Sequence, residues 1–317
     1  MQLRLRGRIM TFFLFCSVGL IGLLLGGTLL VQGAVGIAAR LGVSPLLIGV
    51  VLVGFGTSTP ELLTSLNAAL AGSPGIATGN VVGSNIANIL LILGLTALVR
   101  PALLDHKIMV LDGSAMMLVT LLAVPMLLSG MIGRIEGTIL CAALATYLIV
   151  RVSKGGEIDA IDELEAPPPV LRASVAFAAG LAVTLISAHF LVLGAVGFAR
   201  LLDISEAVIG VTIVAVGTSL PELVTSLIAA RKGQSDMAIG NILGSNIFNI
   251  LGILGLTALI HPLEVPLSIS SYDQWIMVAA AAALLGAGLS WGRLSRISGG
   301  VFLVSYAAYI ATLVRSL

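Results

Sequence analysis

Charged residues are scarce in this sequence. Only 10% of its 317 residues are Asp, Glu, Lys or Arg, and 58% are hydrophobic, whereas soluble globular domains have about 25% charged residues. This composition excludes an ordinary soluble protein. A transmembrane helix takes about 20 apolar residues, so the chain has room for roughly ten spans and for no sizeable soluble domain. We therefore predict an all-α membrane protein that has the lipid bilayer as a partner.

Cysteine and histidine are rare as well, and they do not cluster. Cys16 and Cys141 lie in separate apolar segments, His106 and His261 lie in expected turns, and His189 stands alone in an apolar stretch. This pattern disfavours zinc and copper, which bind through His and Cys, and we expect no cofactor. The basic residues are dispersed and the net charge is +1, so we expect no nucleic acid and no obligatory protein partner.

Long apolar runs dominate the chain. The first run, residues 1–38, opens with Arg4, Arg6 and Arg8 like a secretory signal, but it continues beyond the length of a signal-peptide core. We therefore predict a retained span. Further apolar stretches follow at 45–71, 75–99, 108–129, 132–151, 170–199, 206–230, 236–260, 273–291 and 297–315. Together these stretches predict ten transmembrane helices.

One polar segment interrupts the apolar sequence. Residues 152–169 carry five acidic residues and end in three consecutive prolines. We predict that this segment is a solvated linker. It divides the chain into a first half at 1–151 and a second half at 170–317, with five spans in each.

The two halves contain copies of one module. Without gaps, an offset of 161 residues aligns Leu41–Pro101 with Leu202–Pro262 at 36 identities in 61 positions. The matches include GTSTPELLTSLNAA against GTSLPELVTSLIAA, and GNVVGSNIANIL against GNILGSNIFNIL. Such self-similarity indicates an internal duplication. Asp112 falls opposite Asp273 in the same register, and we interpret both as charges at helix N-termini.

Because five is an odd number, the second copy must cross the membrane in the opposite direction. The turn 71–75 has no basic residue, whereas its counterpart has Arg231 and Lys232; the turn 100–107 has two basic residues, whereas 261–272 has none. With this arrangement the face that holds the linker has 10 basic residues and the face that holds both termini has 6. By the positive-inside rule, we predict inverted repeats with a cytoplasmic linker and both termini outside.

Glu61 and Glu222 are repeat counterparts that lie well inside apolar segments. An ionisable group at membrane depth is costly and by default indicates a functional site. Each glutamate follows a proline, which lacks an N–H and frees a carbonyl four residues earlier, at Gly56 and Gly217. Broken helices at matching places in two halves are typical of a transporter's substrate site near the bilayer midplane.

A second segment of each copy adds polar side chains. Ser84 and Asn88 are four residues apart, as are Ser245 and Asn249, so each pair shares one helix face. Together with the glutamates, the hydroxyls and the freed carbonyls, they predict a site of oxygen donors, which suits calcium and also sodium. Two carboxylates that lie close together in a low dielectric must be compensated by a cation or a proton. The other asparagines are interpreted as helix-packing residues: Asn80, Asn85, Asn241 and Asn246.

At these residues the sequence resembles the calcium/cation antiporter superfamily, and within it the prokaryotic sodium/calcium exchanger type. The resemblance covers nearly the whole chain and is carried by GTSTPE and GTSLPE with GNVVGSN and GNILGSN. It implies calcium and sodium as transported ions, alternating access, and a prokaryotic inner membrane. It implies a calcium site of Glu61, Glu222, Thr57 and Thr218 completed by Asn88 and Asn249, and sodium sites lined by Ser58, Ser219, Ser84, Ser245 and the carbonyls of Gly54 and Ala215.

One departure from the family pattern leaves the coupling open. Some relatives have an aspartate at one of the two positions of Asn88 and Asn249, so here only two formal charges balance the cargo. Calcium antiport coupled to protons or potassium is therefore the alternative to sodium. A cation channel is less favoured, because channels usually place their filter on an oligomeric axis. The GLSWG sequence around Ser290 matches a nucleophile elbow but ends an apolar helix, and we predict no enzyme.

Overall fold

The computed structural model describes residues 2–154, 167–202, 213 and 215–316. Apart from four two-residue strands, its regular elements are helices. Among the described residues, nine helices are long and apolar enough to cross a membrane: Gly7–Leu41, Pro45–Leu70, Pro74–Val99, His106–Leu128, Arg134–Ser153, Val170–Leu201, Ser235–Ile260, Ile269–Trp291 and Arg296–Arg315. The prediction of an all-helical membrane protein is confirmed. The predicted span at 206–230 lies partly outside the described residues.

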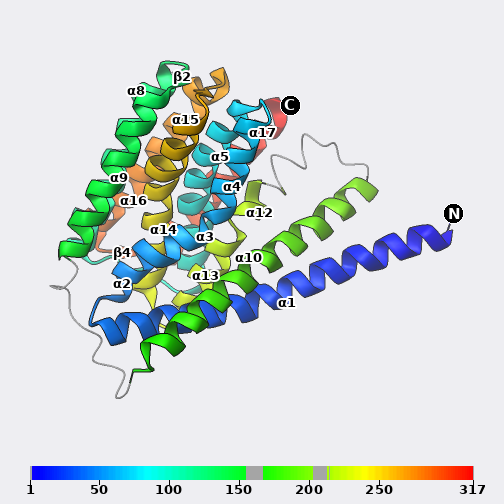
Figure 1. Cartoon of the computed structure of the whole chain (residues 1–317), viewed down its shortest axis with the longest axis horizontal. Helices are drawn as coiled ribbons and strands as arrows, with labels where there is room; N and C mark the ends of the chain where they lie inside the picture. Colours follow the sequence, from blue (N-terminus) through cyan, green and yellow to red (C-terminus); the bar gives the residue numbers. More distant parts are fainter. Residues whose placement is uncertain (1, 155–166, 203–212, 214, 317) are drawn as a thin grey trace.

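Two long helices, α1 (Gln2–Leu41) and α10 (Val170–Leu201), lie side by side and project from the rest of the molecule (Figure 1). They run antiparallel with their backbones in contact. A Cβ added at Gly33 would lie 2.3 Å from the Phe177 nitrogen, and one added at Gly180 would lie 2.3 Å from the Leu30 nitrogen. Glycine at these positions is what allows the two helices to approach so closely.

The central bundle is built from matching elements of the two repeats, with π-helical turns labelled η. The first repeat supplies α2 (Pro45–Ile48), η1 (Gly49–Val53), α3 (Gly54–Thr57), α4 (Thr59–Leu70), α5 (Pro74–Ala87), η2 (Asn88–Leu93) and α6 (Gly94–Val99). The second repeat supplies α12 (Ala215–Thr218), α13 (Leu220–Arg231), α14 (Ser235–Phe248), η5 (Asn249–Leu254) and α15 (Gly255–Ile260). Their apolar residues form one core that both halves share.

The outer helices of each half pack on the central helices of the other half. They comprise α7 (His106–Ile108), η3 (Met109–Gly113), α8 (Ser114–Leu128), α9 (Arg134–Lys154), η6 (Ile269–Asp273), α16 (Gln274–Trp291) and α17 (Arg296–Ser316). Helix α9 contacts α15 and η5, and α17 contacts α6 and η2. Ser290, which matched the nucleophile elbow, lies within helix α16.

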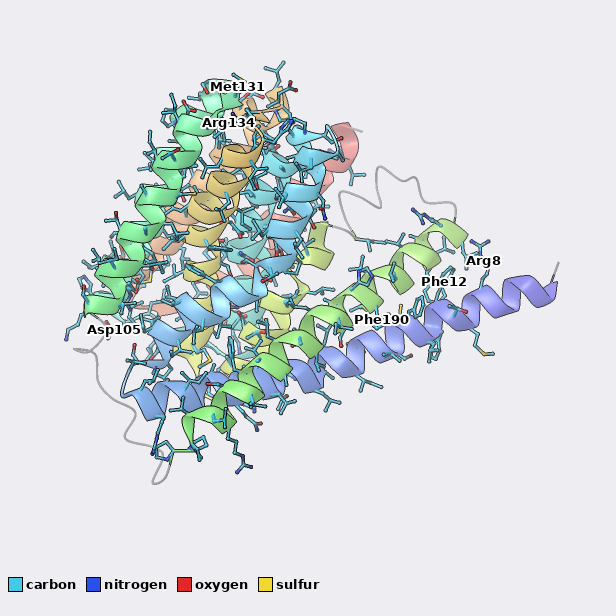
Figure 2. All side chains as sticks on the ribbon, in the orientation of Figure 1. Arg8, Phe12, Asp105, Met131, Arg134 and Phe190 are labelled. Atoms are coloured by element: carbon cyan, nitrogen blue, oxygen red, sulfur yellow. The ribbon has the colours of Figure 1, made fainter. Side chains whose placement is uncertain are left out.

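Two short antiparallel strand pairs close the ends of the bundle. Strand β1 (Ala102–Leu103) pairs with β4 (Arg293–Leu294), and β2 (Met131–Ile132) pairs with β3 (Leu263–Glu264). We call the β1/β4 end the linker face, because α9 ends and α10 begins there, and the β2/β3 end the terminal face. Figure 2 shows Asp105 at the linker face and Met131 and Arg134 at the terminal face.

A buried ion pair in the outer layer was missed from the sequence. Arg151 Nε lies 2.7 Å from Asp112 Oδ1, with side chains that are 1% and 0% exposed, and the Tyr147 hydroxyl donates to the same oxygen at 3.0 Å. The interpretation of Asp112 as a charge at a helix N-terminus is therefore wrong, since it lies in η3 with a cationic partner. This ion pair has little signal in the sequence, because Arg151 borders the polar linker.

Candidate functional site

The helix breaks that the prolines predict are present in both repeats. Helix α3 ends at Thr57, Ser58 has φ −79° and ψ 9°, and α4 begins at Thr59. In the second repeat, Ser219 has φ −87° and ψ 7° between α12 and α13. Because the following proline has no N–H, the ladder of helical hydrogen bonds is interrupted there. Each break thus has a serine at the kink and a glutamate three residues further along the chain.

One of the carbonyls that the sequence predicts to be free is in fact satisfied. The Thr59 hydroxyl donates to the Gly56 carbonyl at 2.8 Å. The second repeat has Leu220 at the position of Thr59, and leucine has no hydroxyl to offer Gly217. A side chain at a single position therefore makes the two breaks chemically different, which the sequence repeat did not indicate.

The two glutamates are buried at the centre of the molecule, and each is 1% exposed. Ser219 Oγ donates to Glu61 Oε1 at 3.1 Å, and Ser58 Oγ donates to Glu222 Oε1 at 2.8 Å. Each serine thus contacts the carboxylate of the other repeat. Within the described ranges, Oε2 of neither glutamate has a hydrogen-bond partner, and no basic side chain forms an ion pair with either.

Further oxygen atoms surround the carboxylates. Thr57 Oγ1 donates to the Val53 carbonyl at 3.0 Å and contacts Asn241 Oδ1 at 3.2 Å. Ser245 Oγ donates to the Gly54 carbonyl at 3.2 Å. The Thr218 hydroxyl lies beside the Glu61 carboxylate. The structure therefore brings hydroxyls and a carbonyl of both repeats to the two glutamates.

The remaining predicted ligands lie on the elements around this centre. Ser84 is on α5, Asn88 begins η2 and Asn249 begins η5, and all three are buried. The turn η2 contacts α13, which carries Glu222, and η5 contacts α4, which carries Glu61. Ala215 is the first residue of α12. Asn88 Oδ1 and both polar atoms of Asn249 have no hydrogen-bond partner in the described part of the chain.

Two asparagines hold the glutamate-bearing helices in place. Asn80 Nδ2 donates to the Glu61 carbonyl at 3.0 Å and to Ser65 Oγ at 2.9 Å. In the second repeat Asn241 Nδ2 donates to the Glu222 carbonyl at 3.4 Å and to Ser226 Oγ at 2.9 Å. Their interpretation as helix-packing residues is confirmed, and the contacts also fix the backbone at each glutamate.

The chemistry of this centre is that of a hard-cation site. Two buried carboxylates with no basic partner among the described residues carry uncompensated negative charge, which is costly in a low dielectric. Carboxylate, hydroxyl, carbonyl and carboxamide oxygens are the ligands that calcium and sodium use. We conclude that the arrangement can hold a calcium ion or sodium ions, which would supply the missing positive charge.

A cavity of about 360 Å³ lies beside the centre and reaches Thr218. It lies between α4, α10 and α12, and its lining includes Leu63, Thr64, Ala188, His189 and Thr218. Helix α4 runs from the break at Ser58 toward the terminal face, because the turn after it lies near β3. The α4 residues that line the cavity therefore lie on the terminal-face side of the break at Ser58.

On the linker side, α1 and α13 are in close contact at the equivalent place. A Cβ added at Gly27 of α1 would lie 2.8 Å from the Ile228 side chain and 3.0 Å from the Val224 side chain of α13. The repeat counterparts of Gly27 and Val224 are Ala188 and Leu63, which line the open cavity. The helices α1 and α13 are thus in close contact, whereas their counterparts α10 and α4 have a cavity between them.

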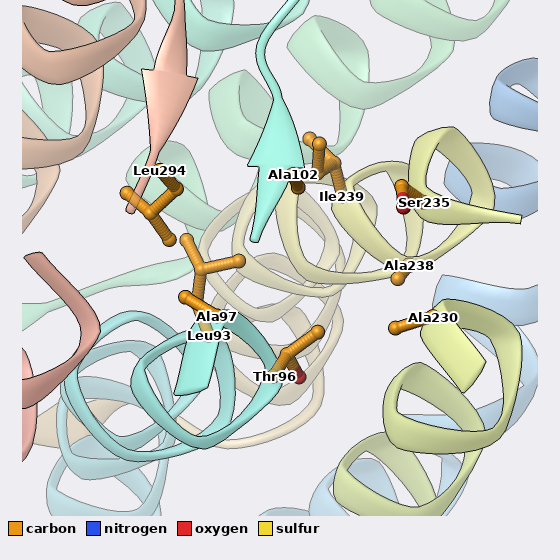
Figure 3. Close-up of a pocket in the computed structure, with 9 residues that line it drawn as sticks. All are labelled: Leu93, Thr96, Ala97, Ala102, Ala230, Ser235, Ala238, Ile239 and Leu294. Carbon is orange, nitrogen blue, oxygen red and sulfur yellow. The ribbon is translucent and has the colours of Figure 1, made fainter. Parts of the chain in front are cut away.

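A second site at the linker face is also tightly packed. Figure 3 shows the side chains that meet there from η2, α6, β1, α13, α14 and β4. They are Leu93, Thr96, Ala97, Ala102, Ala230, Ser235, Ala238, Ile239 and Leu294. These elements of the two halves are therefore in close contact at the linker face.

One protein-family model matches almost the whole chain. The family model described as "Sodium/calcium exchanger protein" matches residues 11–153 and 172–315. This chain belongs to the sodium/calcium exchanger family. It is thus a membrane antiporter of a family of cation transporters, and the resemblance seen in the two sequence motifs is confirmed.

Individual members of the exchanger family match over almost the whole chain. The chain is 39% identical to the putative antiporter CaxA of Alkalimonas amylolytica, over 93% of this chain and 96% of that protein. It is 37% identical to the inner membrane protein YrbG of Escherichia coli, over 93% and 94%. A solved structure of the sodium-calcium exchanger NCX_Mj, soaked with sodium, superposes with a TM-score of 0.86 and 34% identity, over 96% of this chain and 99% of that one.

We expect that alanine at the break serines weakens cation binding. Ser58→Ala removes the donor to Glu222, and Ser219→Ala removes the donor to Glu61. Hydrogen bonds to charged groups contribute about 1.5–3 kcal/mol, so each change should raise the KM for calcium by about ten- to a hundredfold. The measurement is calcium flux into proteoliposomes as a function of calcium concentration. Ser305→Ala, on the exposed side of α17, is the control. An unchanged KM for calcium in both site variants would show that these hydrogen bonds do not support the carboxylates as calcium ligands.

Proposed function

We propose that this chain is a secondary active antiporter that exchanges calcium for sodium at the centre formed by Glu61 and Glu222. The observation that carries the proposal is the pair of buried carboxylates, each 1% exposed. Each accepts a hydrogen bond from the other repeat, and neither has a basic partner among the described residues. A divalent cation matches the two negative charges of this centre. The names of NCX_Mj and of the matching family model support sodium and calcium as the exchanged ions.

The proposed division of ligands is the one that the family resemblance implies. Calcium binds between Glu61 and Glu222, and sodium ions bind at the flanks. The ligands of calcium are Glu61, Glu222, Thr57, Thr218, Asn88 and Asn249; those of sodium are Ser58, Ser219, Ser84, Ser245 and the carbonyls of Gly54 and Ala215. The contact of Ser245 with the Gly54 carbonyl supports this division. Calcium takes about six to eight oxygens, which this set can supply.

Alternating access is the mechanism that the two faces of the centre support. The halves 1–151 and 170–317 act as inverted five-helix repeats, joined by the linker 152–169, and α12 with α13 belongs to the predicted span 206–230. The strand pairs β1/β4 and β2/β3 each join one turn of the first half to one of the second, as inverted repeats require. In one state a cavity lies beside Ala188 and α1 contacts α13 at Gly27. In the other state α1 and α13 separate and the cavity beside Ala188 closes.

We place the protein in a prokaryotic inner membrane with the linker in the cytoplasm and both termini outside. The relative YrbG is named an inner membrane protein, and the excess of basic residues at the linker face supports the orientation. In this orientation the cavity beside His189 opens to the outside. Sodium that enters from outside drives calcium out of the cytoplasm.

The proposal is tested by ion flux in proteoliposomes that contain the purified protein. Vesicles loaded with sodium and diluted into sodium-free medium should take up radiolabelled calcium, because outward movement of sodium drives calcium inward. Vesicles without protein, and vesicles loaded with choline, are the controls. Calcium uptake that is independent of the sodium gradient would contradict sodium coupling.

The same vesicles distinguish the alternative couplings. Calcium uptake that follows an imposed pH gradient would show that protons replace sodium, and a requirement for potassium would show a potassium-dependent exchanger. Calcium movement down its own gradient, with no counter-ion required, would indicate a channel. Absence of calcium flux under all gradients would mean that the centre carries another cation.

A further inference from the structure

The carboxamide of Asn88 has two different ends, and only one of them can bind a cation. Its oxygen, Oδ1, is an acceptor, whereas its nitrogen, Nδ2, carries two hydrogens and can only donate. Both ends are buried with the residue, which is 1% exposed. A ligand role for Asn88 therefore requires the protein to fix which end faces the ion.

A chain of two hydrogen bonds fixes this orientation. Asn88 Nδ2 donates to Asn246 Oδ1 at 3.0 Å, and Asn246 Nδ2 contacts Met116 Sδ at 3.5 Å. A thioether sulfur has no hydrogen to give, so Asn246 must turn its NH₂ group toward Met116 and its oxygen toward Asn88. Asn88 must then turn its own NH₂ group toward Asn246. Its Oδ1 is left without a hydrogen-bond partner in the part of the chain that is described.

The three residues come from three elements that meet between the halves. Met116 is on α8, Asn246 is on α14 and Asn88 begins η2, and α14 contacts both other elements. Met116 is 0% exposed and Asn246 is 1% exposed. Water therefore has no access with which to replace either contact, and rotation of one amide would set two NH₂ groups against each other.

The second repeat lacks this chain of contacts. The counterparts of Met116, Asn246 and Asn88 in the repeat register are Met277, Asn85 and Asn249. Both polar atoms of Asn85 and of Asn249 have no hydrogen-bond partner among the described residues. Met277 is as deeply buried as Met116, at 1% exposed. The same residue types are present twice, but only one set holds its carboxamide in a single orientation.

We propose that Met116 is a positioning residue, which acts through Asn246 to turn the Asn88 carboxamide oxygen toward the cation. This inference rests on the proposed function, because it assigns Asn88 to the site of the transported calcium. Met116 touches no ion itself. Its sulfur selects the orientation of one amide, and that amide selects the orientation of the next.

The test replaces Met116 by leucine, which has nearly the same volume but has no sulfur acceptor. Met116→Leu should raise the KM for calcium roughly threefold, the size of one weak hydrogen bond, with little change in the maximal rate of sodium-dependent uptake. Met277→Leu makes the same change at the counterpart and should leave the KM unchanged. Equal KM values for the two variants would overturn the proposal.

A second comparison separates orientation from packing. Asn88→Asp replaces the carboxamide by a carboxylate, whose two oxygens need no orienting partner. In this background, Met116→Leu should have no further effect on the KM for calcium. If it raises the KM by the same factor in both backgrounds, Met116 acts through packing and the proposal is wrong. Should Asn88→Asp not transport, the calcium-induced rise in the thermal unfolding midpoint gives the same comparison.

The experiment also distinguishes this inference from the function on which it rests. Wild-type protein is measured in every series. If wild type shows sodium-dependent calcium uptake and Met116→Leu behaves like Met277→Leu, only the positioning role fails. If wild type shows no calcium uptake, the proposed function fails and the positioning role falls with it.

Discussion

Glutamine at position 61 or 222 is expected to abolish sodium-dependent calcium uptake. Glutamine nearly preserves the shape of the side chain, so the change removes one negative charge from a centre in which both carboxylates are 1% exposed. Removing one partner of a buried charge pair costs about 3–5 kcal/mol. That corresponds to a loss of about a hundredfold or more in calcium affinity. The measurement is calcium uptake by proteoliposomes, with Glu61→Gln and Glu222→Gln studied separately.

An exposed glutamate provides the control for this result. Glu264, in β3 at the terminal face, is exposed, and Glu264→Gln makes the same chemical change outside the centre. It should transport like wild type. If either site variant kept near-normal uptake while it remained folded and monodisperse in detergent, a carboxylate pair could not be the calcium site. An unequal loss would show that the two repeats contribute unequally.

Loss of the buried arginine is expected to have the second largest effect, and on stability rather than on transport chemistry. Arg151→Met leaves Asp112 buried at 0% exposed without its cation, and breaking such a pair costs about 3–5 kcal/mol. Thermal unfolding in detergent should show a midpoint lower by several degrees. Arg315→Met, on the exposed end of α17, should leave the midpoint unchanged.

A double variant tests the reason for this loss. Arg151→Met combined with Asp112→Asn removes both charges, and replacement of a whole buried pair is often close to neutral. The double variant should therefore recover most of the lost stability. If it unfolds at the same temperature as Arg151→Met, the loss arises from packing around the long arginine side chain and not from an unpaired charge.

The broad architecture could be predicted because the membrane leaves few alternatives. Lipid offers no hydrogen bonds to the backbone, so long apolar stretches must form helices. The duplication could be read directly from 36 identities in 61 positions. Glu61 and Glu222 were identified because a charge at that depth has a high cost, and the prolines beside them predicted the helix breaks at Ser58 and Ser219.

Other features could not be predicted, because the sequence does not show which partner a buried polar group takes. Arg151 borders a polar segment, and only the packing of α9 against η3 places it at Asp112. The Gly56 carbonyl is satisfied by Thr59, one of the positions at which the two copies differ. Neither contact has a periodic or compositional signal.

The sequence by itself determined the class of the protein, its repeat and the two glutamates, since these follow from solvation costs that act on each residue locally. Only the tertiary structure decided how the two copies meet. It paired Ser58 with Glu222 and Ser219 with Glu61, across the repeats and not within them. It also opened the cavity beside Ala188 while its counterpart Gly27 stays in contact with α13. Which side is open depends on how each copy packs against the other, so it cannot be predicted from either copy alone.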